Sequence, residues 1–159
     1  MSMGVQVVFE THSTSEDNEA GIATGWLPGR LSATGREQAR ELGERRRDDG
    51  IAVAFTSDLG RAIETAEIAF ARSSLPVLAD ERLRECDYGE LNGTPAPLDD
   101  RAAHIDVPYP GGESWRQAVE RVADFLGKLR RRTRRRARPR DRSQSRRGSP
   151  WTWLRTAAS

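Results

Sequence analysis

The stretch that decides the fold is residues 5–14, VQVVFETHST, in which an apolar run ends and His12 follows. A nearly unbroken, β-branched run of this kind is typical of a strand that is buried on both faces of a parallel sheet. Ligands of such sheets bind at the carboxyl ends of the strands. Because His12 follows the expected strand closely, we predict that it lies at this edge of the sheet.

Further strands and helices are expected to alternate after this run. Residues 51–55 and 76–78 are short apolar segments, and helical patterns cover 34–47, capped by Thr34, and 59–70. This alternation predicts right-handed crossovers and an α/β fold, a three-layer α/β/α sandwich. A last helix is expected over residues 114–129. Its inner face would be formed by Val119, Val122, Phe125, Leu126 and Leu129.

The charge of the chain divides it into two parts. All 159 residues together carry a net charge of +2. Residues 1–129 hold 14 Lys and Arg against 23 Asp and Glu, a net charge of −9. Residues 130–159 hold 12 Arg against Asp141 alone, a net charge of +11. The sequence therefore predicts one folded α/β domain at 1–129 and an Arg-rich tail at 130–159 without apolar periodicity.

Cysteine usage and hydropathy indicate the cellular environment of the protein. Cys86 is the only cysteine, which excludes a disulfide within the chain and favours a reducing compartment. We expect its thiol to be buried as a small apolar group. No signal-like segment opens the chain and no apolar run is long enough to span a bilayer. The prediction is a cytoplasmic protein without a membrane partner.

Two later segments supply residue types that phosphoryl transfer requires. Residues 56–66, TSDLGRAIETA, place Arg61 after the second expected strand, and residues 83–93, LRECDYGELNG, contain Glu85. Phosphoryl transfer needs an in-line nucleophile, positive donors around the phosphoryl oxygens, and an acid for the leaving group. We assign these roles to His12, Arg61 and Glu85, respectively.

Three further side chains are candidates for binding the phosphoryl group. Asn18 and the hydroxyls of Ser13 and Thr14 would donate hydrogen bonds to its oxygens. Taken one at a time, these positions have ordinary structural alternatives: His12 as a hydrogen-bonded structural residue and Arg61 as a surface charge. Their joint order, spacing and placement after strands favour a site.

The same segments resemble the histidine phosphatase superfamily, the phosphoglycerate-mutase-like enzymes, over roughly residues 4–129. The first motif of that family is Arg-His-Gly-Glu followed shortly by Asn, and the equivalent positions here are Thr11, His12, Ser13, Thr14 and Asn18. The segments around Arg61 and Glu85 are similar to those that carry the family's second phosphate-binding arginine and its proton-donating glutamate. Residues 25–39 and 110–114 also resemble family segments.

The resemblance implies a phosphoglycerate-mutase-like fold and a phosphomonoester hydrolase that acts through a phosphohistidine at His12. The implied partner is a small phosphorylated substrate, and no metal ion or cofactor is expected. A phosphatase is favoured over a mutase, because nothing in the sequence suggests the extended lid with which a mutase holds out water.

Departures from the family pattern predict an impaired site. The arginine before the nucleophile is replaced by Thr11, and the only other histidine is His104, well before the family's late strand and second histidine. We therefore expect the last strand or strands to be missing. One alternative is a catalytically weak phosphate-binding protein of the same fold. A homodimer, in which a second subunit covers the open sheet edge, also fits.

The tail at 130–159 has three interpretations. Twelve arginines suggest a basic arm that binds nucleic acid, but the aromatic residues are confined to Trp151 and Trp153, so nucleic acid is the less favoured partner. A solvated, disordered extension is the second. The third, which we favour, is a tail that is translated in the wrong reading frame. Codons for residues 144–148, read one base later, can encode Ser-His-Gly-Gly-Val, which resembles the missing family motif that contains the second histidine.

Overall fold

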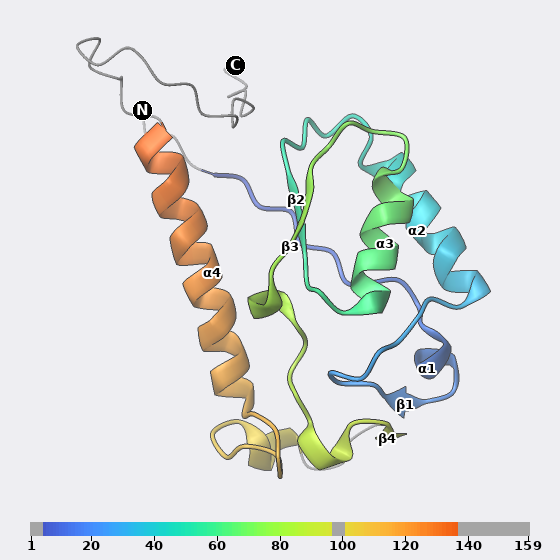
Figure 1. Ribbon diagram of the computed structural model, residues 1–159, viewed down its shortest axis with the longest axis vertical. Coiled ribbons are helices and arrows are strands. Elements are labelled where there is room, and N and C mark those ends of the chain that lie inside the picture. The colour runs from blue at the N-terminus through green and yellow to red at the C-terminus, as the bar shows by residue number, and fades with distance from the viewer. Residues whose placement is uncertain (1–4, 97–100, 137–159) are drawn as a thin grey trace.

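The computed structural model describes residues 5–96 and 101–136. Strands β2 (Ala54–Thr56) and β3 (Val77–Ala79) pair in parallel. Helices α2 (Ala33–Arg45) and α3 (Gly60–Phe70) lie on one side of this pair, and α4 (Trp115–Arg136) lies on the other (Figure 1). The predicted α/β layering, helix–sheet–helix, is therefore present.

Helix α2 packs closely on its neighbours because two of its positions are glycine. Its N-cap is Ser32, whose Oγ accepts a hydrogen bond from the backbone N–H of Gly35 at 3.1 Å, and not the expected Thr34. A Cβ at Gly35 would lie 1.9 Å from the carbonyl oxygen of Thr14, and one at Gly43 would lie 2.1 Å from that of Ala69. The two glycines let the backbones of α2, α3 and the His12 segment approach one another.

The first expected strand does not form, and this prediction is wrong for the described chain. Residues 5–9 have no strand assignment, and the side chains of Val7 and Phe9 are 59% and 83% exposed. A strand forms only where neighbouring strands accept and donate its backbone hydrogen bonds. In residues 5–96 and 101–136, the only other strand pair is β1 (Ile22–Ala23) with β4 (Thr94–Pro95), which is antiparallel.

Helix α4 is longer than expected and buries only part of the predicted inner face, with Val122 and Leu129 half-buried. It continues to Arg136, past the predicted end at residue 129, so the predicted domain boundary falls within a helix. Phe125 is buried and meets Phe55 of β2 edge to face, with ring centroids 5.1 Å apart. Val119 and Leu126, both predicted for the inner face, are exposed. Residues 137–159, which make up most of the predicted tail, lie outside the described residues.

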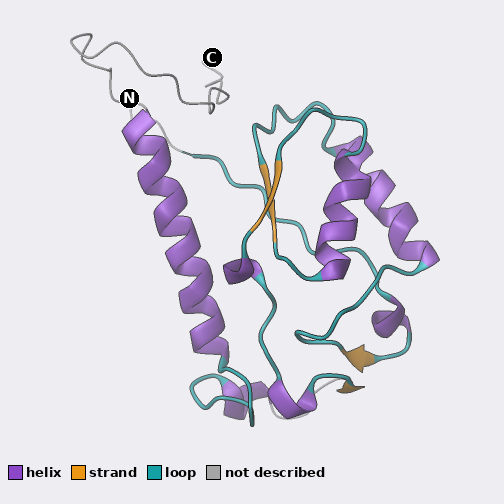
Figure 2. Ribbon diagram, in the orientation of Figure 1, coloured by secondary structure: helices purple, strands orange, loops and turns teal. Residues whose placement is uncertain are grey.

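Short elements connect these layers. Figure 2 shows that the chain between β3 and α4 is mostly loop. A buried cluster joins this segment to α4 and comprises Cys86, Tyr88 and Tyr109 of the segment and Ala118 of the helix. Cys86 is buried, as predicted, and burial raises the pKa of its thiol to about 12. The short helices are α1 (Glu16–Glu19), η1 (Glu81–Leu83), η2 (Gly89–Leu91) and η3 (Arg101–His104).

Candidate active site

Arg61 is the centre of the candidate site. It lies in the first turn of α3, directly after β2, and its side chain is 1% exposed. The interpretation of Arg61 as a surface charge is therefore wrong. Thr65, one turn later, donates to the carbonyl oxygen of Arg61 at 2.7 Å and accepts from the backbone N–H of Ser13 at 3.0 Å. Thr65 thus ties the segment that carries His12 to the start of α3.

The contacts of His12 define its tautomer. The Nε–H of Arg61 lies 3.2 Å from His12 Nε2, and a guanidinium can only donate, so Nε2 must be the unprotonated, accepting nitrogen. His12 Nδ1 lies 2.7 Å from the carbonyl oxygen of Ser13, where it acts as the donor. The imidazole is therefore neutral in this arrangement, with the lone pair of Nε2 directed at the guanidinium.

Glu85 completes the cluster. Arg61 Nη2 donates to Glu85 Oε2 at 2.9 Å, and the hydroxyl of Tyr88 donates to Glu85 Oε1 at 2.6 Å. Burial and the bond to Glu85 raise the pKa of Tyr88, so its hydroxyl stays a donor across the usual pH range. The Glu85 side chain remains 38% exposed, so its carboxyl can be reached from solvent.

The loop after β1 holds the far side of the guanidinium. Arg61 Nη2 donates to the carbonyl oxygen of Gly25 at 2.8 Å, and Nη1 lies 3.5 Å from that of Leu27. Gly25 has a φ of +54°, and a Cβ there would lie 1.7 Å from Oδ1 of Asn92. Only glycine fits this turn, and the turn aims the carbonyl at Arg61.

The other predicted phosphate ligands make different contacts in this structure. Thr14 donates through both its backbone N–H and its hydroxyl to Oε1 of Gln38, at 3.0 and 2.9 Å. Asn18 forms a capping box with Ser15 at the start of α1. The side chain of Ser13 is buried. Phosphate binding by Ser13, Thr14 and Asn18 stays a prediction.

His104 lies apart from the cluster. Its ring stacks on Tyr109 with centroids 3.9 Å apart, and its Nδ1 lies 3.0 Å from the carbonyl oxygen of Val107. Both partners of these contacts lie in the segment between η3 and α4, away from Arg61.

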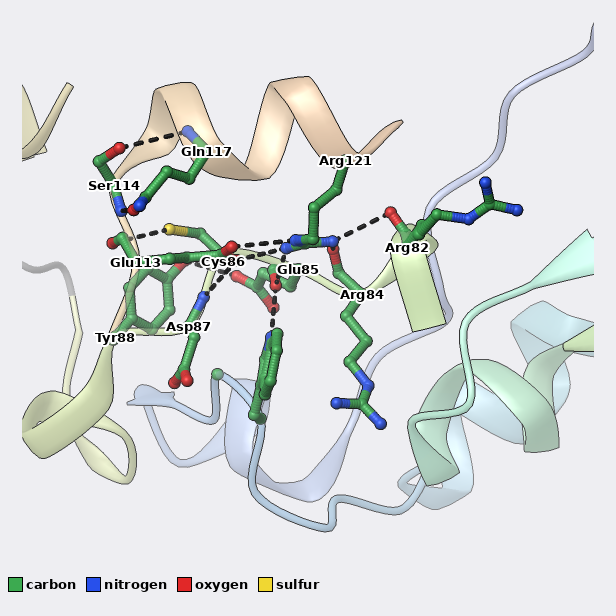
Figure 3. Close-up of polar contacts among 12 residues, drawn as sticks. Arg82, Arg84, Glu85, Cys86, Asp87, Tyr88, Glu113, Ser114, Gln117 and Arg121 are labelled. Atoms are coloured by element: carbon green, nitrogen blue, oxygen red, sulfur yellow. Dashed lines mark hydrogen bonds and ion pairs between the residues drawn. The ribbon is translucent and has the colours of Figure 1, made fainter. Parts of the chain in front are cut away.

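Several residues around Glu85 were not identified from the sequence. Trp26 Nε1 donates to the carbonyl oxygen of Glu85 at 2.7 Å. Figure 3 shows Arg121 of α4 directed at the backbone that carries Glu85, with Glu113 beside it. Tyr88 lies in the quoted segment 83–93, three residues after Glu85, and that spacing could have indicated it. Nothing in the local sequence singles out Arg121.

Metal-binding clusters and membrane-spanning helices are both absent from the described ranges. No group of three or more His, Cys, Asp or Glu side chains within 5–96 and 101–136 is arranged to hold a metal ion. None of the helices in that part of the chain is long and apolar enough to cross a membrane.

The described α/β layers bring together a histidine, a buried arginine and a glutamate, and Arg61 contacts both of the other side chains. The chain belongs to the histidine phosphatase superfamily (branch 1), whose family model matches residues 8–137. The resemblance inferred from the motifs around His12, Arg61 and Glu85 is thereby confirmed.

Curated relatives carry the name 2,3-bisphosphoglycerate-dependent phosphoglycerate mutase. The protein from Parvibaculum lavamentivorans is 34% identical over 137 residues, which cover 77% of this chain and 65% of the relative. The protein from Methylobacterium sp. is 38% identical over 136 residues, which cover 75% of this chain and 64% of the relative. The chain therefore spans slightly less than two thirds of the length of these relatives.

Solved structures confirm the phosphoglycerate-mutase-like fold. A mycobacterial glucosyl-3-phosphoglycerate phosphatase in complex with VO3 is 30% identical, with a TM-score of 0.66, covering 74% of this chain and 63% of that one. Phosphoglycerate mutase from Thermus thermophilus is 35% identical, with a TM-score of 0.59, covering 73% of this chain and 67% of that one.

Proposed function

We propose that the protein is a phosphomonoester hydrolase that acts through a phosphohistidine at His12. The observation that carries the proposal is the 3.2 Å contact between Arg61 Nε and His12 Nε2, with Nδ1 bonded to the carbonyl oxygen of Ser13. This arrangement leaves a fixed, neutral imidazole whose lone pair points to the group that would bind phosphate. A neutral imidazole is a good nucleophile toward phosphorus.

In the first step, His12 Nε2 attacks phosphorus and the bond to the leaving oxygen breaks. Glu85, as its carboxylic acid, gives a proton to that oxygen, while Arg61 donates to the phosphoryl oxygens. An incoming phosphoryl group competes with Glu85 for the guanidinium.

In the second step, water attacks the phosphorus and the N–P bond breaks. Glu85, now a carboxylate, takes a proton from the attacking water, which releases inorganic phosphate and restores the neutral His12. Throughout both steps the contacts of Arg61 with the carbonyl oxygens of Gly25 and Leu27 would keep the guanidinium in place.

We also propose that catalysis by this chain is weak. Thr11 replaces the charged donor that precedes the nucleophile in the family pattern, and removing one such donor typically lowers the rate by about 10²–10³. A turnover in the ordinary range of about 1–10³ per second would contradict this proposal. If catalysis is lost altogether, the chain is a phosphate-binding protein of the same fold.

A mutase is the second candidate, because the curated relatives are named phosphoglycerate mutases. Both activities share the phosphohistidine and differ in what discharges it. The labelled phosphoprotein is isolated and divided into two portions, one kept in buffer alone and one mixed with a monophosphoglycerate. If the chain is a phosphatase, the portion in buffer alone should release inorganic phosphate. Discharge that requires a monophosphoglycerate and yields a bisphosphorylated product would favour the mutase.

The test of the shared step uses the two histidines of the chain. Incubation with a labelled aryl phosphate should leave an acid-labile, base-stable phosphate on the protein, and His12→Ala should abolish it. His104→Ala is the matched control, because His104 contacts Tyr109 and Val107 in the described chain, away from His12 and Arg61, and this variant should keep the label. Label that persists in His12→Ala would contradict the proposal.

A further inference from the structure

We propose that Arg121 of α4 is the positioning residue for the proton donor Glu85. The inference rests on the proposed function, because it concerns the group that protonates the leaving oxygen. Arg121 does not touch the Glu85 carboxyl. It holds the backbone from which that carboxyl projects.

The guanidinium of Arg121 binds three carbonyl groups of this backbone (Figure 3). Its Nη1 donates to the carbonyl oxygens of Arg82 and Arg84, at 3.0 and 3.2 Å, and its Nη2 donates to that of Glu85 at 3.2 Å. A planar guanidinium presents five donors in a fixed fork, so these carbonyl groups are held relative to one another as well as to α4.

Glu113 fixes the orientation of the Arg121 fork. Arg121 Nε donates to Glu113 Oε2 at 2.9 Å, and both side chains of the pair are largely buried. Glu113 also accepts from the backbone N–H of Asp87 through Oε1, and its own N–H donates to the Asp87 carbonyl oxygen, both at 3.0 Å. The pair therefore binds the chain on both sides of Glu85.

These side-chain bonds matter because residues 84–88 belong to no helix or strand. A loop has no backbone ladder to fix its carbonyl groups, so the partners that satisfy them determine its position. Trp26 adds a bond to the Glu85 carbonyl oxygen at 2.7 Å, and its ring centre lies 5.7 Å from the Arg121 guanidinium. Trp26 follows Gly25, whose carbonyl oxygen accepts a hydrogen bond from Arg61. The same loop therefore contacts both Arg61 and the backbone of Glu85.

If Arg121 positions the acid, its removal should lower the rate of cleavage by an amount that depends on the leaving group. Phenolate is a poor leaving group and needs a proton as it departs, whereas 2,4-dinitrophenolate departs without one. If Arg121 places the acid, its removal slows cleavage of phenyl phosphate and spares that of 2,4-dinitrophenyl phosphate. A purely structural role would lower both rates and phosphate affinity together.

The experiment measures phenol release in a single turnover with enzyme in excess, together with phosphate affinity by calorimetry. For Arg121→Met we expect a loss of about 10- to 100-fold with phenyl phosphate, in line with a misplaced catalytic group. The loss with 2,4-dinitrophenyl phosphate should stay below about threefold, a small part of what an acid supplies, and phosphate affinity should be unchanged. Glu85→Gln should show the same selectivity, more strongly.

Two variants keep the test decisive. Arg116→Met is the matched control on the same helix, because Arg116 is mostly exposed and pairs with Asp106, and both rates should match the wild type. If Arg121→Met does not unfold cooperatively, Arg121→Lys serves instead. Lysine keeps a charge beside Glu113, but its single nitrogen cannot reproduce the fork by which Arg121 binds three carbonyl groups and the Glu113 carboxylate together, so a smaller loss of the same selectivity is expected.

The outcomes separate the inference from the proposed function. The Arg121 variants could lose the same fraction of the cleavage rate with both substrates, while Glu85→Gln loses rate mainly with phenyl phosphate. That result would overturn the inference and leave the proposed function standing. A Glu85→Gln variant without selectivity would overturn the role of Glu85, and the inference with it. Selective loss in both sets of variants supports both.

Discussion

Removal of the Arg61 guanidinium is the most direct test of the candidate site. In Arg61→Ala the nitrogens that contact His12, Glu85 and the carbonyl oxygen of Gly25 disappear from a position that is 1% exposed. We expect the variant to bind inorganic phosphate or vanadate more weakly than the wild type, because the guanidinium proposed to bind the phosphoryl oxygens is gone.

The magnitude follows from counting donors before and after an anion binds. Nε and Nη2 would exchange His12 and Glu85 for phosphoryl oxygens, so two hydrogen bonds to a fully charged anion replace one to a neutral imidazole and one to the partly exposed Glu85. The net gain is about one hydrogen bond to a charged group, roughly 1.5–3 kcal/mol. Phosphate affinity should therefore fall by about 10- to 150-fold.

Calorimetric titration with phosphate measures this loss without relying on activity. Arg72→Ala is the control, because Arg72 follows the end of α3 and its side chain is 88% exposed. Its phosphate affinity should equal that of the wild type. A folded Arg61→Ala variant that binds phosphate as tightly as the wild type would refute the reasoning.

Three further predictions concern Thr11, Phe9 and Cys86. Thr11→Arg should raise single-turnover rates by up to about 10², the effect of one charged donor; no change would mean that an arginine at this position does not reach the phosphoryl group. Phe9→Ser should reduce light scattering at high concentration and change the free energy of unfolding by less than about 0.5 kcal/mol, because the ring is exposed; a large destabilisation would instead show that a second chain covers Phe9. The raised pKa of Cys86, about 12, means that above pH 9 the unfolded chain loses the thiol proton first, so stability should fall as pH rises from 9 toward 12. In urea titrations this part of the fall should be absent from Cys86→Ala, and an equal fall in both proteins would contradict the assignment.

Local patterns predicted two helices and two strands of the described chain. The helices now seen as α2 and α3 and the strands β2 and β3 lie within a few residues of their expected positions. The run at residues 5–9 has the composition of a buried strand, yet it forms none in the described structure. A strand is stabilised by partners elsewhere in the chain, and composition reports only the tendency to accept them.

The candidate site was predictable from its residue types and their order along the chain, although of the three residues Arg61 alone comes shortly after a strand in the described structure. His12, Arg61 and Glu85 do meet, and Arg61 joins the other two. Arg121 was not predictable, because an arginine between apolar helix positions has the same local pattern whether it faces water or a loop. The same ambiguity applies to α4, where Phe125 of the predicted inner face packs against Phe55 but Val119 and Leu126 of that face are exposed.

The parts of the site become available at different times during synthesis. Arg61 follows its partner His12 by 49 residues, whereas the tether of Glu85 to Arg121 spans a further 36 residues of chain. Chains are made at about 5–20 residues per second, so Arg121 is added roughly 2–7 s after Glu85. Until α4 has emerged and docked, a nascent chain would hold the anion-binding half of the site without a placed acid. Under the proposed function, such a chain would bind phosphate esters before it can turn them over.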